Sequence, residues 1–252
     1  MVFRCDVVLH AEPGTGYREE ALGKLVKRSR TGLVCRFWLM AFFLCLPIAA
    51  AAQARLAEGF SRLPQGALVT LMPLDIELYS ISAGGVVEPQ AEWTAKAHAN
   101  LWEAFLTRQS ALEVNFKPLP DDADEVIQRL NRLHGAVGLA ISGFDLPTKE
   151  GRLDWSLGDE AIAIRNQTGA DYALFSYVRD SYASSERAAM MVLGALLGVG
   201  LQGGMQVGYA SLVELSTGRI VWFNRLLRAR GDLRELDKAR ESADALLAKF
   251  PE

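Results

Sequence analysis

Four acidic residues and one tryptophan lie close together in the middle of the chain and are the first candidates for chemistry. Asp145, Asp154, Asp159 and Glu160 flank Trp155. Two converging carboxylates can act as general acid and base, and an aromatic ring can stack on a sugar, so this group would suit hydrolysis of a polymer. Acidic residues next to a helix start also serve as caps and solvated groups. We therefore keep Asp154, Asp159 and Glu160 only as an alternative acid/base group.

Histidine and cysteine, the usual metal ligands and nucleophiles, are scarce. The cysteines are Cys5, Cys35 and Cys45, and the histidines that follow them are His98 and His134. These two fall on different predicted helices, where we expect solvated or helix-terminal roles. A zinc site usually includes a close-spaced pair such as His-x-x-x-His, and many hydrolases carry a Gly-x-Ser-x-Gly turn; the sequence has neither. The sequence therefore predicts no metal site, no cofactor and no catalytic residue.

Three arginines gather within six residues near the end of a predicted strand. They are Arg225, Arg228 and Arg230, on a chain whose formal net charge is −3. A basic patch on an acidic protein could meet anionic lipid head groups or an acidic partner. Strand-end arginines whose alkyl stems cover apolar surface are the alternative, and both interpretations stay open. Because no nucleic-acid-binding motif accompanies these arginines, we expect no nucleic-acid partner.

The chain from residue 188 to residue 213 runs for 26 residues without a charged side chain. Its first part, residues 188–208, is a glycine-rich apolar insertion. Five of its glycines have spacings that let helices approach closely: Gly194, Gly198, Gly200, Gly204 and Gly208. Three interpretations stay open: a small-residue helix packed on the sheet or on a sister subunit, an apolar loop that docks on a partner or membrane, and a segment of an oligomeric pore. A single membrane crossing is disfavoured because the insertion lies between two predicted strands of one sheet.

The elements that position these residues follow from the hydrophobic pattern, with a period of two in strands and three to four in helices. The predicted strands are 67–72, 112–116, 170–182 and a hairpin around Ser216-Thr217-Gly218; the predicted helices are 92–109, 121–142, 158–168 and 232–250. Their order is β-α-β-α-α-β-(apolar insertion)-β-β-α. This order predicts an α/β (α+β) fold, in which a mixed β-sheet of about five strands is covered by helices.

The beginning of the chain has the pattern of an export signal. A basic stretch from Lys24 to Arg30 precedes an apolar run from Phe37 to Ala52, and Ala52-Gln53-Ala54 follows as a cleavage site. We therefore expect residues 24–54 to be a signal peptide and residues 1–23 to be an upstream extension from a misassigned start. A retained membrane anchor is the alternative, although the run is shorter than the about 20 residues that a span needs. Residues 55–252 would then form a single domain in the periplasm or cell envelope.

Three segments resemble one group of bacterial envelope domains. They are "LVTLMPLD" at 68–75, "GADYALFSYV" at 169–178 and "ASLVELSTGRIVWF" at 210–223. In wording and order they resemble the TolB amino-terminal domain and the curli-secretion pore lipoprotein, over most of residues 66–250. The resemblance implies a periplasmic α/β domain. The lipidated cysteine of those relatives is missing, because neither Cys35 nor Cys45 follows the small residue that lipoprotein processing favours.

Taken together, these features predict a non-catalytic exported envelope protein with a binding or assembly role in the periplasm or at the outer membrane. The expected partners are an envelope protein or a second copy of the chain, with peripheral membrane contact as a further option. Two alternatives stay open: a carboxylate-dependent hydrolase of an envelope polymer, and a subunit of an oligomeric secretion complex.

Overall fold

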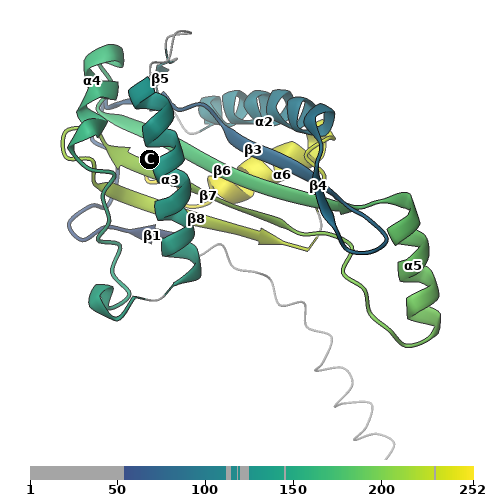
Figure 1. The fold of residues 1–252 in the computed structure, drawn as a ribbon. Helices are drawn as coiled ribbons and strands as arrows, with labels where there is room; N and C mark the ends of the chain where they lie inside the picture. The colour runs from purple at the N-terminus through teal and green to yellow at the C-terminus, as the bar shows by residue number, and fades with distance from the viewer. Residues whose placement is uncertain (1–53, 112–114, 118, 120–124, 145, 230) are drawn as a thin grey trace, which may run out of the picture. The chain divides into compact units, whose positions relative to one another are not determined.

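A mixed β-sheet of eight strands is the framework of the computed structural model (Figure 1), which describes residues 54–111, 115–117, 119, 125–144, 146–229 and 231–252. The predicted upstream extension and nearly all of the predicted signal peptide lie outside these residues, as do Asp145 and Arg230. The strands are β1 (Arg55–Leu56), β2 (Leu68–Leu71), β3 (Asp75–Ile81), β4 (Val87–Pro89), β5 (Asn115–Lys117), β6 (Tyr172–Ala183), β7 (Gln206–Glu214) and β8 (Ile220–Arg228). The main path of the sheet is β1-β8-β7-β6-β2-β5.

The centre of the sheet is an antiparallel meander of β6, β7 and β8. Gly218 supplies the positive φ, 68°, that the turn between β7 and β8 requires, as the hairpin prediction expected. On the other side of β6, both β2 and β3 pair with it in parallel, β2 against Tyr172–Leu174 and β3 against Tyr177–Ala183. β6 is therefore the strand that joins the amino-terminal and carboxy-terminal parts of the sheet.

Pro73 separates β2 from β3, because proline has no N–H to donate to a strand ladder. The predicted strand ends at this proline, as expected, but the chain resumes as β3 only two residues later. The Asn131 side-chain amide donates to the Pro73 carbonyl oxygen at 3.0 Å, which ties the break to a helix on one face of the sheet. The break lets one long side of β6 be covered by two consecutive strands.

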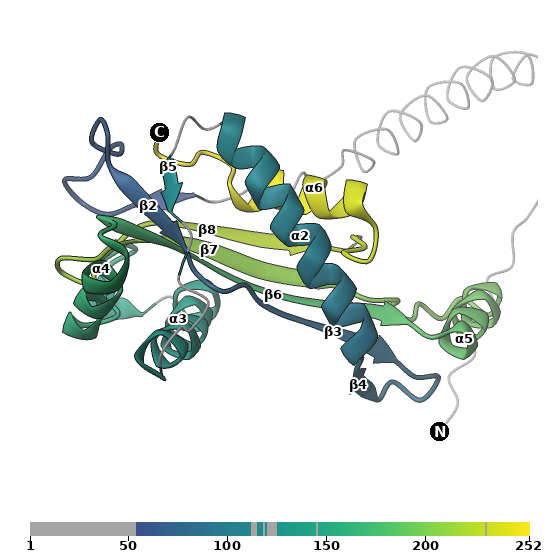
Figure 2. The same ribbon diagram turned by 90° about the horizontal axis from the view of Figure 1, so that it is seen from above.

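Helices cover both faces of the sheet (Figure 2). On one face lie α2 (Ala91–Ala111) and α6 (Leu236–Leu246), and on the other lie α3 (Glu125–Gly143) and α4 (Ile162–Thr168). Each face has its own apolar core, one centred on Leu101, Phe105 and Trp222 and the other on Ile127, Phe175 and Phe223. The prediction of a mixed sheet covered by helices is confirmed.

The predicted count of about five strands is wrong. β1 and β4 span only 2 and 3 residues, which is too short for a periodic pattern to reveal. From the sequence, no strand is expected at β3, which follows a proline, although its sequence DIELYSI alternates between polar and apolar residues, as half-buried strands do. The order also contains one more helix, α5 (Ser185–Leu196), which overlaps the first part of the apolar insertion.

Candidate interaction surface

The chain leaves β6 through a well-formed helix start and enters the apolar insertion. Ser184 is the N-cap of α5, and its hydroxyl accepts a hydrogen bond from the Arg187 backbone N–H at 3.2 Å. The Ser184 backbone N–H in turn donates to the Ile81 carbonyl of β3 at 2.9 Å. After α5, residues 197–205 return to β7. We call residues 185–205 the apolar arm; α5, its helix, lies at one end of the sheet (Figures 1 and 2).

Polar contacts fasten the base of the apolar arm. The Arg187 guanidinium donates to the Gln202 carbonyl at 2.9 Å and so joins the helix to the returning loop. Ser181 on β6 holds the end of that loop, because its hydroxyl donates to the Met205 carbonyl at 3.1 Å and accepts from the Met205 N–H at 3.0 Å. The Val199 N–H donates to the Gly194 carbonyl at 2.8 Å, within the arm itself. The arm is therefore a built element whose backbone is tied at both ends.

The side chains of the apolar arm are nevertheless exposed. No residue of α5, all of which the structure describes, is buried. Leu196 and Leu197 are 79% and 81% exposed. The other large exposed apolar side chains of the arm are Met190, Val192, Leu193, Val199 and Met205. Soluble proteins rarely expose large contiguous apolar patches, and those that do commonly use them for binding. The arm is thus the strongest candidate for an interaction surface.

Among the residues that the structure describes, no helix combines the length and the apolar character that crossing a membrane requires. α5 has 12 residues, which at about 1.5 Å per residue is well short of the bilayer's hydrocarbon thickness.

The predicted glycine pattern has a different role from helix packing. Only Gly194 lies in a helix; the remaining four are in the loop and in β7. A Cβ added at Gly204 would lie 2.1 Å from the Ser181 carbonyl oxygen, and one at Gly208 would lie 2.7 Å from that of Tyr177. Gly198 has a φ of 76° just after α5, and Gly200 has open space around it. Gly204 and Gly208 therefore let the chain return closely past β6, and the expected helix-packing face does not form, because only one of the five glycines is helical.

The predicted basic patch is split between the two faces of the sheet. Arg225 donates to the Ser142 carbonyl of α3 at 2.9 Å, whereas Arg228 forms an ion pair with Glu241 of α6 at 3.2 Å. Successive residues of a strand point to opposite faces, so side chains three positions apart cannot share one. Arg230 lies outside the described residues. Arg225 and Arg228 thus serve two different helices.

The acidic residues of the alternative hydrolase site are engaged separately. Asp154 lies 3.4 Å from the Lys149 ammonium nitrogen, and Glu160 lies 3.1 Å from the Arg129 guanidinium. Asp159 begins a short 3-10 helix, η2 (Asp159–Ala161). The structure therefore gives Asp154 and Glu160 two different cationic partners and shows no contact between them. In the described part of the chain, no group of three or more His, Cys, Asp or Glu residues could hold a metal ion.

His134 lies in the core, so the expectation of a solvated role for it is wrong. Its Nε2 is 2.9 Å from the Ser211 hydroxyl, and its ring packs between Phe175 and Tyr209. Burial lowers its pKa to about 3, so the ring is neutral near pH 7. Both His134 and Ser211 are fully buried, so neither side chain is accessible to solvent. The pair resembles a catalytic dyad only in its residue types, while His98 is exposed on α2.

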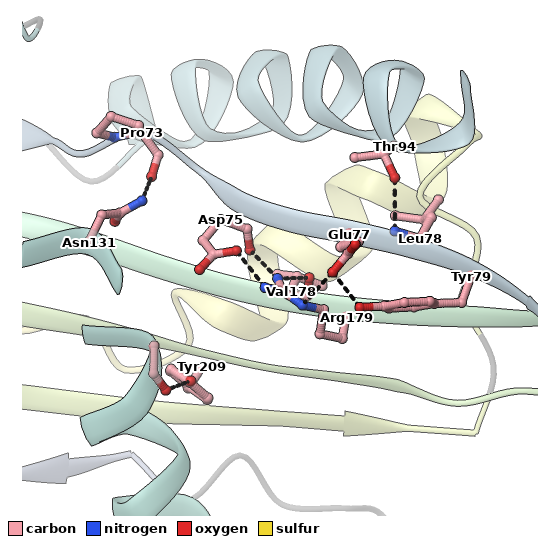
Figure 3. A network of polar contacts seen from close by, with 11 residues as sticks. Pro73, Asp75, Glu77, Leu78, Tyr79, Thr94, Asn131, Val178, Arg179 and Tyr209 are labelled. Atoms are coloured by element: carbon pink, nitrogen blue, oxygen red, sulfur yellow. Dashed lines mark hydrogen bonds and ion pairs between the residues drawn. The ribbon is translucent and has the colours of Figure 1, made fainter. Parts of the chain in front are cut away.

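A polar cluster that sequence reasoning missed joins β3 to β6 (Figure 3). The Arg179 guanidinium forms ion pairs with Asp75 at 2.7 Å and Glu77 at 3.5 Å, and it lies 4.0 Å from the centre of the Tyr177 ring. The Tyr79 hydroxyl donates to Glu77; burial and then this carboxylate raise the Tyr79 pKa to about 12. Each charged group is matched within the cluster. The cluster helps to hold β3 in register with β6. The alternation of polar and apolar residues in β3 is the sequence signal that could have placed Asp75, Glu77 and Tyr79 on one face of a strand.

Comparison with known proteins finds no matching protein-family model and no matching curated protein. Similar solved structures include the PelC dodecamer from Paraburkholderia phytofirmans, at 12% identity and a TM-score of 0.34, covering 79% of this chain and 98% of that one. The LpoB C-terminal domain from Salmonella enterica follows at 16% and 0.28, covering 69% and 88%. Lipoprotein GNA1162 from Neisseria meningitidis gives 12% and 0.30, covering 74% and 99%. These similar structures thus include a lipoprotein; because each of their TM-scores is below 0.5, they carry no argument about family or function.

Proposed function

We propose that this protein is a non-catalytic exported envelope protein whose role is to bind a partner, or to assemble with one, through the apolar arm. The observation that carries the proposal is the exposure of Leu196, Leu197 and their neighbours on a helix whose base is fastened by hydrogen bonds. The signal-peptide pattern that ends at Ala54 supports a location in the periplasm or cell envelope.

The backbone of the arm is held by hydrogen bonds while its side chains are exposed. This contrast indicates that the arm binds a partner and does not serve to stabilise the folded chain. Exposed apolar surface lowers solubility and promotes nonspecific association. A fold that holds such an element in a fixed position is therefore best explained if another surface covers its apolar side chains when the protein binds. Leu196 and Leu197 contribute little to the two cores, which lie around the sheet. A binding role explains both facts with one cause.

The proposal is tested by recovering partners of the exported protein from envelope extract. The full chain, expressed with its own leader and a carboxy-terminal tag, is compared with the double variant Leu196→Gln/Leu197→Gln. The matched control is Leu139→Gln/Ile162→Gln, which replaces two exposed apolar side chains on α3 and α4, outside the arm. We expect the control to recover the wild-type partners and the arm variant to lose them. Equal recovery by all three proteins would overturn the proposal.

A further inference from the structure

A second apolar segment, far away in the sequence, meets the apolar arm. The hairpin between β3 and β4 turns through residues 82–86, and its Ser82 N–H donates to the Val86 carbonyl at 2.9 Å. Val86 and Val87 are 59% and 54% exposed. The Arg187 guanidinium donates to the Ser82 carbonyl at 3.4 Å, so the hairpin and the base of α5 are in contact. Figures 1 and 2 both place β4 and α5 at the same end of the sheet.

The stretches of these two segments that carry the exposed apolar side chains contain no charged residue. Residues 81–87 of the hairpin and 188–205 of the arm contain no charged residue. The cation between them, Arg187, directs its guanidinium to the carbonyl oxygens of Gln202 and Ser82. The nearest carboxylates in sequence are exposed and border these two stretches: Glu88 lies in β4 and Glu186 in the first turn of α5. Residues 81–87 and 188–205 therefore present exposed apolar side chains from two segments at the same end of the sheet, and neither stretch contains a charged residue.

The exposed side chains of α5 also point in many directions. At about 100° per residue, Met190, Val192, Leu193, Leu196 and Leu197 are spread around nearly half of the helix circumference, and the exposed Ala188 and Ala195 widen that arc. A helix that packs against one protein surface needs a single apolar stripe and keeps polar residues on its opposite side. α5 has no such polar side after Arg187. A medium that surrounds the helix fits this distribution better than one flat protein surface does.

We infer that the apolar arm and the β3–β4 hairpin together insert into one face of a lipid bilayer without crossing it. This inference rests on the proposed function and names its partner as a lipid surface. Because residues 81–87 and 188–205, which carry the exposed apolar side chains, are uncharged and the chain is acidic, with a net charge of −3, apolar transfer and not charge attraction drives the binding. Zwitterionic lipid is therefore sufficient, and binding changes little between low and high salt, unlike electrostatic binding.

The test uses the absence of cysteine after Cys45, which lets a single introduced cysteine carry an environment-sensitive fluorophore. The exported, processed chain is prepared as Leu197→Cys, Val86→Cys and, as the matched control on α3, Leu139→Cys. Each labelled protein is titrated with vesicles of phosphatidylcholine, with and without an anionic lipid, at low and high salt. We expect a several-fold fluorescence increase and a blue shift for the labels at 197 and 86 in every condition, and no change at 139.

Three outcomes would overturn the inference. The first is no response to vesicles at 197. The second is a response at 197 without one at 86, which removes the hairpin from the inserted surface. The third is a response at 197 that rises with protein concentration in the absence of lipid, which identifies a second copy as the occupant. If the arm variant loses its envelope partners while no label responds to vesicles, the proposed function stands and the lipid surface does not.

Discussion

Helices α2 and α5 are both rich in apolar residues, yet the fold treats them in opposite ways. α2 buries Ala97, Leu101, Ala104 and Phe105 at 0–2% exposure, while none of the residues of α5, all of which the structure describes, is buried. The outer side of α2 carries exposed charges such as Glu92, Lys96 and Glu103, whereas α5 has none after Arg187. The difference teaches that a core helix is marked by the polar side opposite its apolar stripe, and apolar content alone does not predict burial.

The largest expected effect comes from truncating the buried side of α2. Phe105→Ala leaves a cavity beneath the helix, and such changes typically reduce the free energy of unfolding by about 3–5 kcal/mol. The adjacent Leu106 is 44% exposed, so Leu106→Ala should change it by less than about 0.5 kcal/mol. Urea unfolding followed by circular dichroism measures both variants. Similar losses for the two would show that α2 does not have the buried and exposed sides described.

Like α2, helix α3 packs on the sheet, and its buried His134 makes the free energy of unfolding depend on pH. The folded-state pKa of about 3 lies below the ordinary 6.5, so the unfolded chain binds a proton first as pH falls. The stabilisation from keeping His134 neutral is therefore fully present above pH 6.5 and is lost progressively as the pH falls toward 3. At 1.36 kcal/mol per pH unit, the free energy of unfolding falls by about 3 kcal/mol between pH 6.5 and pH 4.

Measuring unfolding free energy from pH 7 to pH 4 checks this expectation. His134→Gln should flatten the part of the profile that the histidine causes, while the exposed His98→Gln should keep the wild-type shape. A wild-type profile that His134→Gln leaves unchanged would mean that the histidine has the same pKa in the folded and the unfolded chain.

The next effect comes from the close approach of α3 to the sheet. A Cβ at Gly138 would lie 2.0 Å from the Tyr209 ring, so Gly138→Ala forces either the ring or the helix to move. Overpacking of this kind typically destabilises by about 1–3 kcal/mol. Gly143, at the end of the same helix, has no neighbour within 4 Å of its added Cβ and provides the control. If Gly138→Ala were as stable as Gly143→Ala in thermal unfolding, α3 would not pack on Tyr209 as described.

The smallest expected effect lies in the apolar arm and completes the comparison with α2. Leu196→Gln/Leu197→Gln replaces two side chains that are about four-fifths exposed, so each change should alter the free energy of unfolding by less than about 0.5 kcal/mol. The same urea experiment used for Phe105→Ala measures it. A loss of several kcal/mol would show that these leucines pack in the folded protein, and α5 would then belong with α2.

Much of the fold could be predicted from the sequence where local pattern and tertiary packing agree. The helix expected at 92–109 is observed at Ala91–Ala111, and the strand expected at 170–182 is observed at Tyr172–Ala183. In both, a clear apolar period coincides with burial against the sheet. β1 and β4 could not be predicted, because strands this short are defined by the neighbour they pair with.

The candidate surface was only half predictable, for a physical reason. The absence of charge from residue 188 onward was visible in the sequence, but whether those side chains are covered depends on what the rest of the chain brings to them. The contact between the arm and Ser82 joins residues 105 positions apart and leaves no local signal. Conversely, the separation of Arg225 from Arg228 follows from strand alternation and could have been deduced once the strand was predicted.

Vesicle flotation of the exported protein beside its Leu196→Gln/Leu197→Gln variant tests most directly the central claim that the apolar arm binds a lipid surface. The account predicts that wild type floats with phosphatidylcholine vesicles at both low and high salt, while the variant, equally stable in urea, stays in the dense fraction. Folded wild-type protein that remains in the dense fraction, or a variant that floats as well as wild type, would contradict it.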